Sequence, residues 1–288
     1  MTLSIVALDP DTGQLGAAVH TGWLAVGNKV PWVETGVGAV LTQAVTEASY
    51  GPRSLDLLRS GHSPAEALGA LLAEDPQAES RQVAIVDFEG RIAAHTGSAC
   101  IASAGHALGD GVVAVANMAG ADGVWNLMLD AFGNTTGSIA RRLCSAVATG
   151  HEAGGDLRGS TSAALLTAPG GATEPAWARQ VDLRIDDHPD PVTELARLLD
   201  LHEMYDLMGT GINAVTAGRA DEAMNALEAA AGHPLANAQT GFWQAAAQLL
   251  AGDSDDAEAT LRKSTGDDAG WRLLWERNRS SGRLTPPS

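Results

Sequence analysis

Apolar and polar residues alternate with a period of two near the start of the chain, a pattern typical of β-strands. In the segment TLSIVALDPDTGQLGAAV, two such runs flank a turn at residues 9–13. Successive side chains of a strand point to opposite faces, so Thr2, Ser4 and Val6 are expected on one face of the first strand. The sequence therefore predicts an N-terminal hairpin on which Thr2 and Ser4 point the same way.

The same reasoning extends along the first two hundred residues. It predicts strands over 29–34, 36–45, 111–117 and 180–186, a hairpin within 81–97, and a strand that begins near Thr161. Helices are expected over 50–61, from a cap at Ser63 with Glu66 behind it, over 121–132 and over 139–150. This order of elements favours an α+β domain in which two sheets lie between two layers of helices, a four-layer αββα sandwich.

From residue 192 onward the pattern becomes almost wholly helical, and it contains a repeat. Gly218 and Gly252, Asp221 and Asp255, Ala223 and Ala257, and Leu227 and Leu261 are pairs of identical residues, each 34 positions apart. That spacing is the tetratricopeptide (TPR) period, in which small residues allow helices to pack closely. We expect one domain over 1–200 and a TPR-like tail over 201–288; the alternative is a helical bundle of unrelated type.

Composition narrows the classes of partner. The 288 residues carry a net charge of −17, which argues against nucleic-acid and anionic-membrane partners. Cys100 and Cys144 are too few for a disulfide framework, and the strand at residue 2 leaves no room for a secretory signal, so a cytoplasmic protein is expected. No apolar run is long enough to span a membrane. The scattered histidines include no helical pair suited to a metal, and no cofactor is expected.

Thr2 directly follows the initiator methionine. Removal of Met1 would give one residue both a hydroxyl nucleophile and a free α-amine. A hydroxyl needs a base within hydrogen-bond reach, and an α-amine that titrates near about 7.7–8.0 can serve as one. Threonine at this position could equally serve only translation or methionine removal.

Several separated motifs then occur in order: SIVALDPDTGQLG, AVGNKVPW, TQA, SYGPRSLDLL, AAHTG, AGGDLRG and DDHPDPV. Together they resemble the DUF1028 proteins, a family of undetermined substrate whose fold is similar to that of the N-terminal-nucleophile (Ntn) hydrolases. The resemblance covers residues 2 to about 200. It implies the Ntn sandwich with the nucleophile at the start of the first strand, and some members carry a helical C-terminal extension.

A weaker similarity to proteasome β-subunits suggests further site residues. It implies a catalytic role for Lys29, which lies in the segment that corresponds to the proteasome lysine, although surface charge is the alternative. It also implies that backbone over 42–46, around Ala44, stabilises an oxyanion. Gln43 could supply an amide donor there. Tyr50 could border the pocket or pack in the core.

The glycine-rich loop over 154–161 is the second cluster. By the same similarity, Asp156 and Ser160 would lie against the Thr2 amine, and Arg158 could bind a substrate carboxylate. Thr161 stands where the family usually has glutamine, which puts an amide role there in doubt. Asn117, at a predicted strand end, could stabilise an oxyanion or cap its own backbone.

These features predict an Ntn-type amidohydrolase that uses Thr2 on a small-molecule or peptide amide, with Ser4 as the second candidate nucleophile. A homo-oligomer is expected. The alternative is a catalytically silent scaffold whose TPR-like tail binds a partner peptide.

Overall fold

The computed structural model describes residues 2–170 and 174–282, and these form two antiparallel sheets and a set of helices. The larger sheet has the strand order β10-β9-β2-β1-β8-β7. Its strands are β1 (Thr2–Leu8), β2 (Leu15–Thr21), β7 (Gly105–Gly109), β8 (Val112–Asn117), β9 (Ser162–Ala168) and β10 (Val181–Ile185). The smaller sheet has the order β3-β4-β5-β6, with β3 (Pro31–Glu34), β4 (Gly38–Ala44), β5 (Arg81–Asp87) and β6 (Ile92–Thr96).

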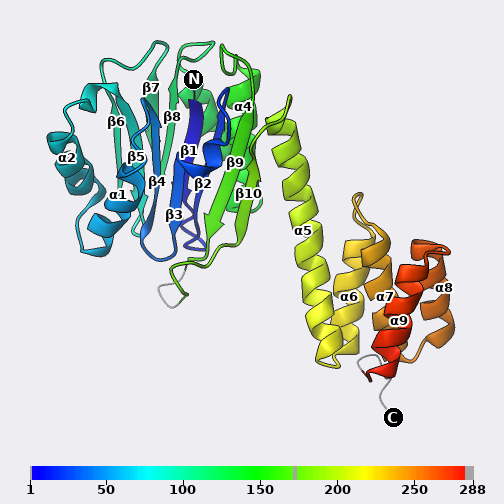
Figure 1. Cartoon of the computed structure of the whole chain (residues 1–288). Helices are drawn as coiled ribbons and strands as arrows, with labels where there is room; N and C mark the ends of the chain where they lie inside the picture. The colour runs from blue at the N-terminus through cyan, green and yellow to red at the C-terminus, as the bar shows by residue number, and fades with distance from the viewer. Residues whose placement is uncertain (1, 171–173, 283–288) are drawn as a thin grey trace. The chain divides into compact units, whose positions relative to one another are not determined.

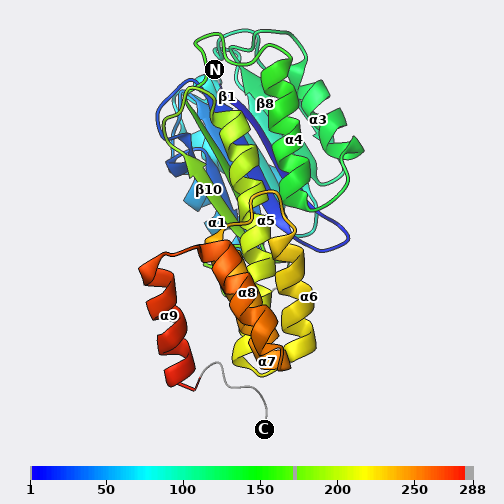
Figure 2. The ribbon, with the colours of Figure 1, turned by 90° about the vertical axis from the view of Figure 1, so that its right-hand side faces the viewer.

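The two sheets face each other, and helices cover their outer faces (Figure 1 and Figure 2). Helices α3 (Val124–Asn134) and α4 (Ile139–Glu152) pack on the larger sheet, where Leu3 of β1 shares a core with Met128 and Leu143. Helices α1 (Tyr50–Arg59) and α2 (Pro64–Glu74) pack on the smaller sheet through a second core. Between the sheets, Val6 and Leu41 belong to a third core. The expected mixed α+β class is confirmed, and both sheets are antiparallel.

Local sequence signals explain much of this arrangement. The alternation in β1 divides its side chains as predicted, because Leu3 packs toward the helices whereas Val6 packs toward the other sheet. At the start of α2, the Ser63 side chain accepts from the Glu66 N–H, and Glu66 bonds back to Ser63, so the capping box is confirmed. Strand β7 was not predicted: its Gly-His-Ala-Leu-Gly sequence has little strand character, and it is held as an edge strand by pairing with β8.

The chain divides into two compact units between Leu199 and Asp200. Helix α5 (Pro191–Thr216) crosses this boundary, and α6 (Ala220–Ala231), α7 (Ala238–Ala251), α8 (Ser254–Thr265) and α9 (Ala269–Ser280) follow it. In the second unit, Phe242 packs against Trp271 and Trp275. Helices α6 and α8 begin 34 residues apart and also end 34 residues apart. None of the helices in the described ranges has the length and apolar character needed to cross a membrane.

Candidate active site

A cavity of about 390 Å³ lies beside the first residue of β1. Residues at the ends of strands from both sheets line it, among them Thr2 and Asn117 from the larger sheet and Ala44 from the smaller one. The segment that follows β2 contributes Lys29, and the loop before β9 contributes Arg158. Thus Thr2, Lys29, Ala44, Asn117 and Arg158, all predicted site residues, meet at one cavity.

Thr2 is held in place by both neighbouring strands of its own sheet and by a side chain of the smaller sheet. In the larger sheet it pairs with Thr21 of β2 and with Asn117 of β8. Its Oγ1 lies 3.2 Å from Thr21 Oγ1, and its carbonyl oxygen accepts from Gln43 Nε2 of the smaller sheet over 3.1 Å. The backbone and the hydroxyl of Thr2 therefore have defined positions at the cavity edge.

A buried chain of polar side chains runs beneath Thr2 and connects the two sheets. Gln43 Nε2 donates to Gln82 Oε1 over 2.7 Å, and Asn117 Nδ2 donates to the same oxygen over 2.9 Å. Gln82 Nε2 donates to the Ala116 carbonyl oxygen over 2.8 Å. Buried amides are stable only when they are hydrogen-bonded, so this network fixes the spacing of the sheets below the cavity. Sequence reasoning missed Gln82, whose signal is a glutamine inside the apolar strand RQVAIV.

The network corrects two predicted roles. Ser4 is fully buried, does not line the cavity, and donates its hydroxyl to Gln43 Oε1. It therefore does not present a nucleophile to a substrate. Gln43 is also fully buried and absent from the cavity lining, so it holds Thr2 instead of contacting a substrate.

Asp156 is connected to Thr2 through two intermediate side chains. Its carboxylate accepts from the Gly22 N–H over 2.7 Å and pairs with Arg158 Nη2 at 3.0 Å. Arg158 Nη2 also donates to Thr21 Oγ1 over 3.3 Å, and Thr21 contacts Thr2. Burial by itself would raise the pKa of Asp156, but the hydrogen bonds from Arg158 and Gly22 outweigh it and lower that pKa. Asp156 is thus an anion that orients Arg158.

Ser160 and Thr161 do not take their predicted places. Ser160 Oγ lies 2.6 Å from His20 Nε2, and neither Ser160 nor Thr161 lines the cavity. His20 points away from Thr2 because residues on β2 alternate in the same way as those on β1. The Thr161 N–H donates to the Thr21 carbonyl oxygen over 3.0 Å, a backbone role. Burial, and next the neighbouring His151, lower the pKa of His20 to about 4.

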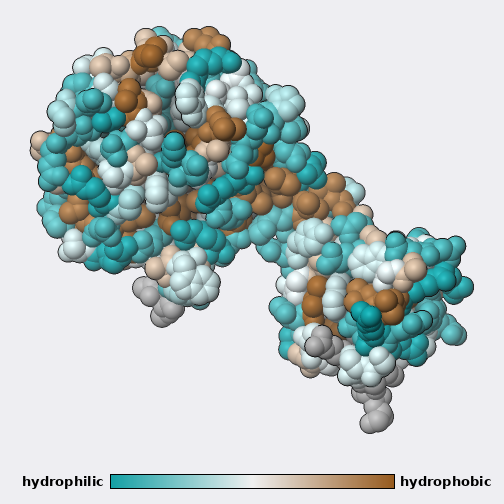
Figure 3. Space-filling model, in the orientation of Figure 1, coloured by the Kyte–Doolittle hydropathy of each residue, from teal (hydrophilic) through white to brown (hydrophobic). Residues whose placement is uncertain are grey.

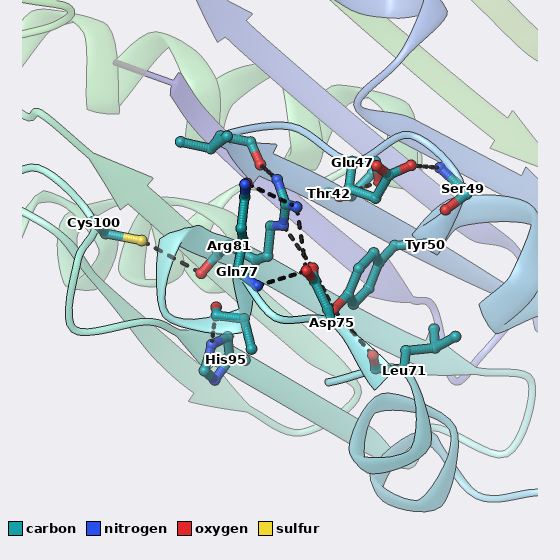
Figure 4. Close-up of polar contacts among 12 residues, drawn as sticks. Thr42, Glu47, Ser49, Tyr50, Leu71, Asp75, Gln77, Arg81, His95 and Cys100 are labelled. Carbon is teal, nitrogen blue, oxygen red and sulfur yellow. Dashed lines mark hydrogen bonds and ion pairs between the residues drawn. The ribbon is translucent and has the colours of Figure 1, made fainter. Parts of the chain in front are cut away.

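Tyr50 packs in the core, as the second of its two predicted roles required. Its hydroxyl donates to Asp75 over 3.1 Å and to the Leu71 carbonyl oxygen over 3.3 Å, outside the cavity (Figure 4). Burial, with hydrogen bonding to Asp75, raises the pKa of Tyr50 to about 12. The sequence similarity placed Tyr50 near the pocket because the helix start is adjacent in the chain to the segment that lines it.

Arg81, which sequence reasoning did not single out, supports the cavity wall from behind. Its Nε donates to Asp75 over 2.7 Å (Figure 4). Its Nη1 donates to the Val45 carbonyl oxygen over 2.6 Å. The Cys100 thiol donates to the Arg81 carbonyl oxygen over 3.3 Å. Val45 and Cys100 both line the cavity, so one largely buried arginine holds two parts of its wall.

The cavity wall also contains unusual backbone. Ala25, Ala44 and Met118 have φ angles of 53°, 70° and 51°, and all three line the cavity. Within the described ranges these are the non-glycine residues with positive φ. A side chain in this left-handed region costs about 1–3 kcal/mol, and such residues gather at functional sites. Their common location supports the choice of this cavity as the candidate site independently of its side chains.

The lining offers little to a metal ion. Cys100 contributes a thiol to the lining, and the described lining residues include no histidine, aspartate or glutamate. Elsewhere in the described ranges, no three such side chains gather in a way that could hold a metal.

Comparisons with known proteins identify the family of the chain. A family model described as a family of unknown function, DUF1028, matches residues 2–195. A crystal structure of a protein from Silicibacter pomeroyi, also assigned to DUF1028, is 34% identical with a TM-score of 0.62, and the similarity covers 69% of this chain and 87% of that chain. No curated protein matches. The chain belongs to the DUF1028 family.

Proposed function

We propose that the protein is an amidohydrolase of the Ntn type, in which Thr2, freed by removal of Met1, is the nucleophile. The observation that carries the proposal is the position of Thr2 at the start of β1, on the edge of a cavity lined by both sheets. An N-terminal threonine there would present its hydroxyl and its amine to the same ligand.

In the proposed reaction, the Thr2 amine takes the hydroxyl proton while Oγ1 attacks the amide carbon. The second N–H of the Asn117 amide, whose first N–H donates to Gln82 Oε1, and backbone near Ala44 would stabilise the resulting oxyanion, since both residues line the cavity. The carbon–nitrogen bond then breaks, and the ammonium returns its proton to the leaving amine. Water, deprotonated by the same amine, hydrolyses the ester, releasing the acid and regenerating the Thr2 hydroxyl.

Thr21, Arg158 and Asp156 would orient the nucleophile. Because Arg158 Nη2 donates to Thr21 Oγ1, the Thr21 hydroxyl proton is available to donate to Thr2 Oγ1. The Thr2 proton would then be directed toward the amine. Asp156 would keep Arg158 in this position by its ion pair.

Two architectural inferences accompany this proposal. The order of helices, two sheets and helices supports an Ntn sandwich for the first unit. The 34-residue offset of α6 and α8, with Ala223, Leu227, Ala257 and Leu261 all buried, supports a TPR-like second unit. An experimental structure of the second unit tests the repeat: α6–α7 should superpose on α8–α9 as successive TPR helix pairs, and a different crossing geometry would reject it.

Intact-mass spectrometry and labelling with a β-lactone test the function. The expected mass lacks Met1, and the lactone should acylate the wild type and Thr2→Ser but not Thr2→Ala. Ser4→Ala is the matched control and should still be labelled, because Ser4 does not line the cavity. Retention of Met1 in protein that reacts fully, or labelling of Thr2→Ala, would overturn the proposal.

A further inference from the structure

The charge of the cavity is opposite to that of the chain. The sequence holds 35 acidic and 18 basic residues. The described lining residues nevertheless include two cations, Lys29 and Arg158, and no carboxylate. Cations without anions in its lining give the cavity a locally positive potential within an acidic protein, and such a potential favours anionic ligands.

The two cations differ in how far they are neutralised. Arg158 makes a two-point contact with Asp156, with Nε 3.1 Å from Oδ1 and Nη2 3.0 Å from Oδ2. Lys29 is exposed, and within the described ranges no carboxylate forms an ion pair with it. The charge of Lys29 is therefore available to a ligand, whereas that of Arg158 is already balanced.

Most of the remaining surface of the cavity is apolar, and part of it is open to solvent. Trp23, Leu24, Val45 and Ile101 line it and expose 66%, 61%, 54% and 63% of their surface. Figure 3 shows several exposed hydrophobic residues among hydrophilic ones at the end of the first unit where Figure 1 marks the N-terminus. Grouped apolar side chains of this size on a surface indicate a binding site for an apolar group.

The volume limits the size of the ligand. At about 390 Å³, the cavity lies near the lower end of the range of about 300–1,000 Å³ found for small-molecule sites. A small ligand with one apolar portion and one negative charge fits the charge, the apolar lining and the volume of the cavity.

From these observations, and resting on the proposed function, we infer that the substrate is a small N-acylated amino acid. Its apolar acyl chain would pack against Trp23, Leu24 and Ile101, and Lys29 would bind its carboxylate. The products are an apolar carboxylic acid and a free amino acid.

Binding to full-length Thr2→Val protein, which cannot form an acyl-enzyme at Thr2, tests the inference without turnover. The probe is N-octanoylglycine, measured by isothermal titration calorimetry against its neutral analogue N-octanoylglycinamide and against N-acetylglycine. The acid should bind about tenfold or more tightly than the amide, since its carboxylate adds a charge-assisted hydrogen bond to Lys29. It should also bind about tenfold or more tightly than N-acetylglycine, since its longer acyl chain buries more apolar surface.

The chain offers a matched pair of variants because Lys29 and Lys263 are its two lysines. Added to Thr2→Val, Lys29→Met should abolish the preference for the acid over the amide, whereas Lys263→Met, on α8, makes the same charge change and should preserve it. Equal affinity for acid and amide, or a preference that survives Lys29→Met, would overturn the inference. Failure of lactone labelling with the acid preference intact would reject the Thr2 chemistry and keep the ligand class.

Discussion

The side-chain amide of Gln43 donates to the carbonyl oxygen of Thr2 over 3.1 Å, which ties the first residue of β1 to the opposite sheet. The same nitrogen donates to Gln82 Oε1 over 2.7 Å, and Gln43 is fully buried. In such surroundings hydrogen bonds are strong and unpaired polar groups are costly. The position of Thr2 therefore depends on a polar network that lies between the sheets.

Gln43→Leu should lower the free energy of unfolding by about 2–4 kcal/mol, because it leaves Ser4, Gln82 and the Thr2 carbonyl without this partner. Urea denaturation at pH 7.5 measures the change. The exposed Gln180→Leu is the control and should stay within about 0.5 kcal/mol of the wild type. A loss below 1 kcal/mol for Gln43→Leu would mean that the network does not hold the sheets.

Arg81→Met should destabilise the protein by about 3 kcal/mol, because the largely buried Asp75 carboxylate and the Val45 carbonyl lose their donor. Arg53→Met removes an exposed ion pair with Glu74 and should cost less than about 1 kcal/mol. Thermal and urea unfolding compare the two variants. Similar losses in both would contradict the role of Arg81 behind the cavity wall.

Ala44→Gly should raise the free energy of unfolding by up to about 1 kcal/mol, since glycine adopts the left-handed backbone of residue 44 without strain. Ala39→Gly, on the same strand but without a positive φ, should lower it by about 1 kcal/mol. The opposite signs are the test, and a loss in both variants would show that Ala44 is not strained.

His20 should make the protein less stable in mild acid. Its pKa is about 4 in the folded protein and about 6.5 in the unfolded chain, so the unfolded chain binds more protons between these values. The contribution of neutral His20 to the free energy of unfolding is therefore fully present well above pH 6.5 and is lost as the pH drops toward 4. At pH 5 this loss is about 2 kcal/mol. His20→Gln should remove this part of the pH dependence, whereas the exposed His62→Gln should retain it. Urea midpoints at pH 7.5 and 5.0 measure the difference.

Thr21→Val should slow β-lactone labelling of Thr2 about tenfold or more while Met1 is still removed, because the hydroxyl that contacts Thr2 Oγ1 and Arg158 is lost. The control is Thr161→Val, which leaves the backbone bond to Thr21 intact and lies outside the cavity. Labelling rates followed by mass spectrometry compare them. An unchanged rate in Thr21→Val would show that Thr21 does not orient the nucleophile.

Parts of this protein follow from short stretches of its sequence. The alternation in β1 assigns Thr2 and Ser4 to one face, and the Ser63 and Glu66 pair marks the start of α2. The spacing of Leu227 and Leu261 corresponds to equally spaced helices in which both residues are buried. These features are readable because backbone periodicity and capping involve residues only a few positions apart.

The tertiary structure determined which of the candidate site residues lie together at the cavity. Ser4 and Thr2 share a face of β1, yet only Thr2 lines the cavity. Ser4 is fully buried because Gln43 of the smaller sheet covers it. Ser160 contacts His20, whereas Asp156 from the same loop pairs with Arg158. The partners of a buried polar group come from distant segments of the chain, so no local pattern names them. The sequence by itself determined the helices, the strands other than β7 and the threonine at the start of β1, whereas only the packing of two sheets determined the cavity that the threonine faces.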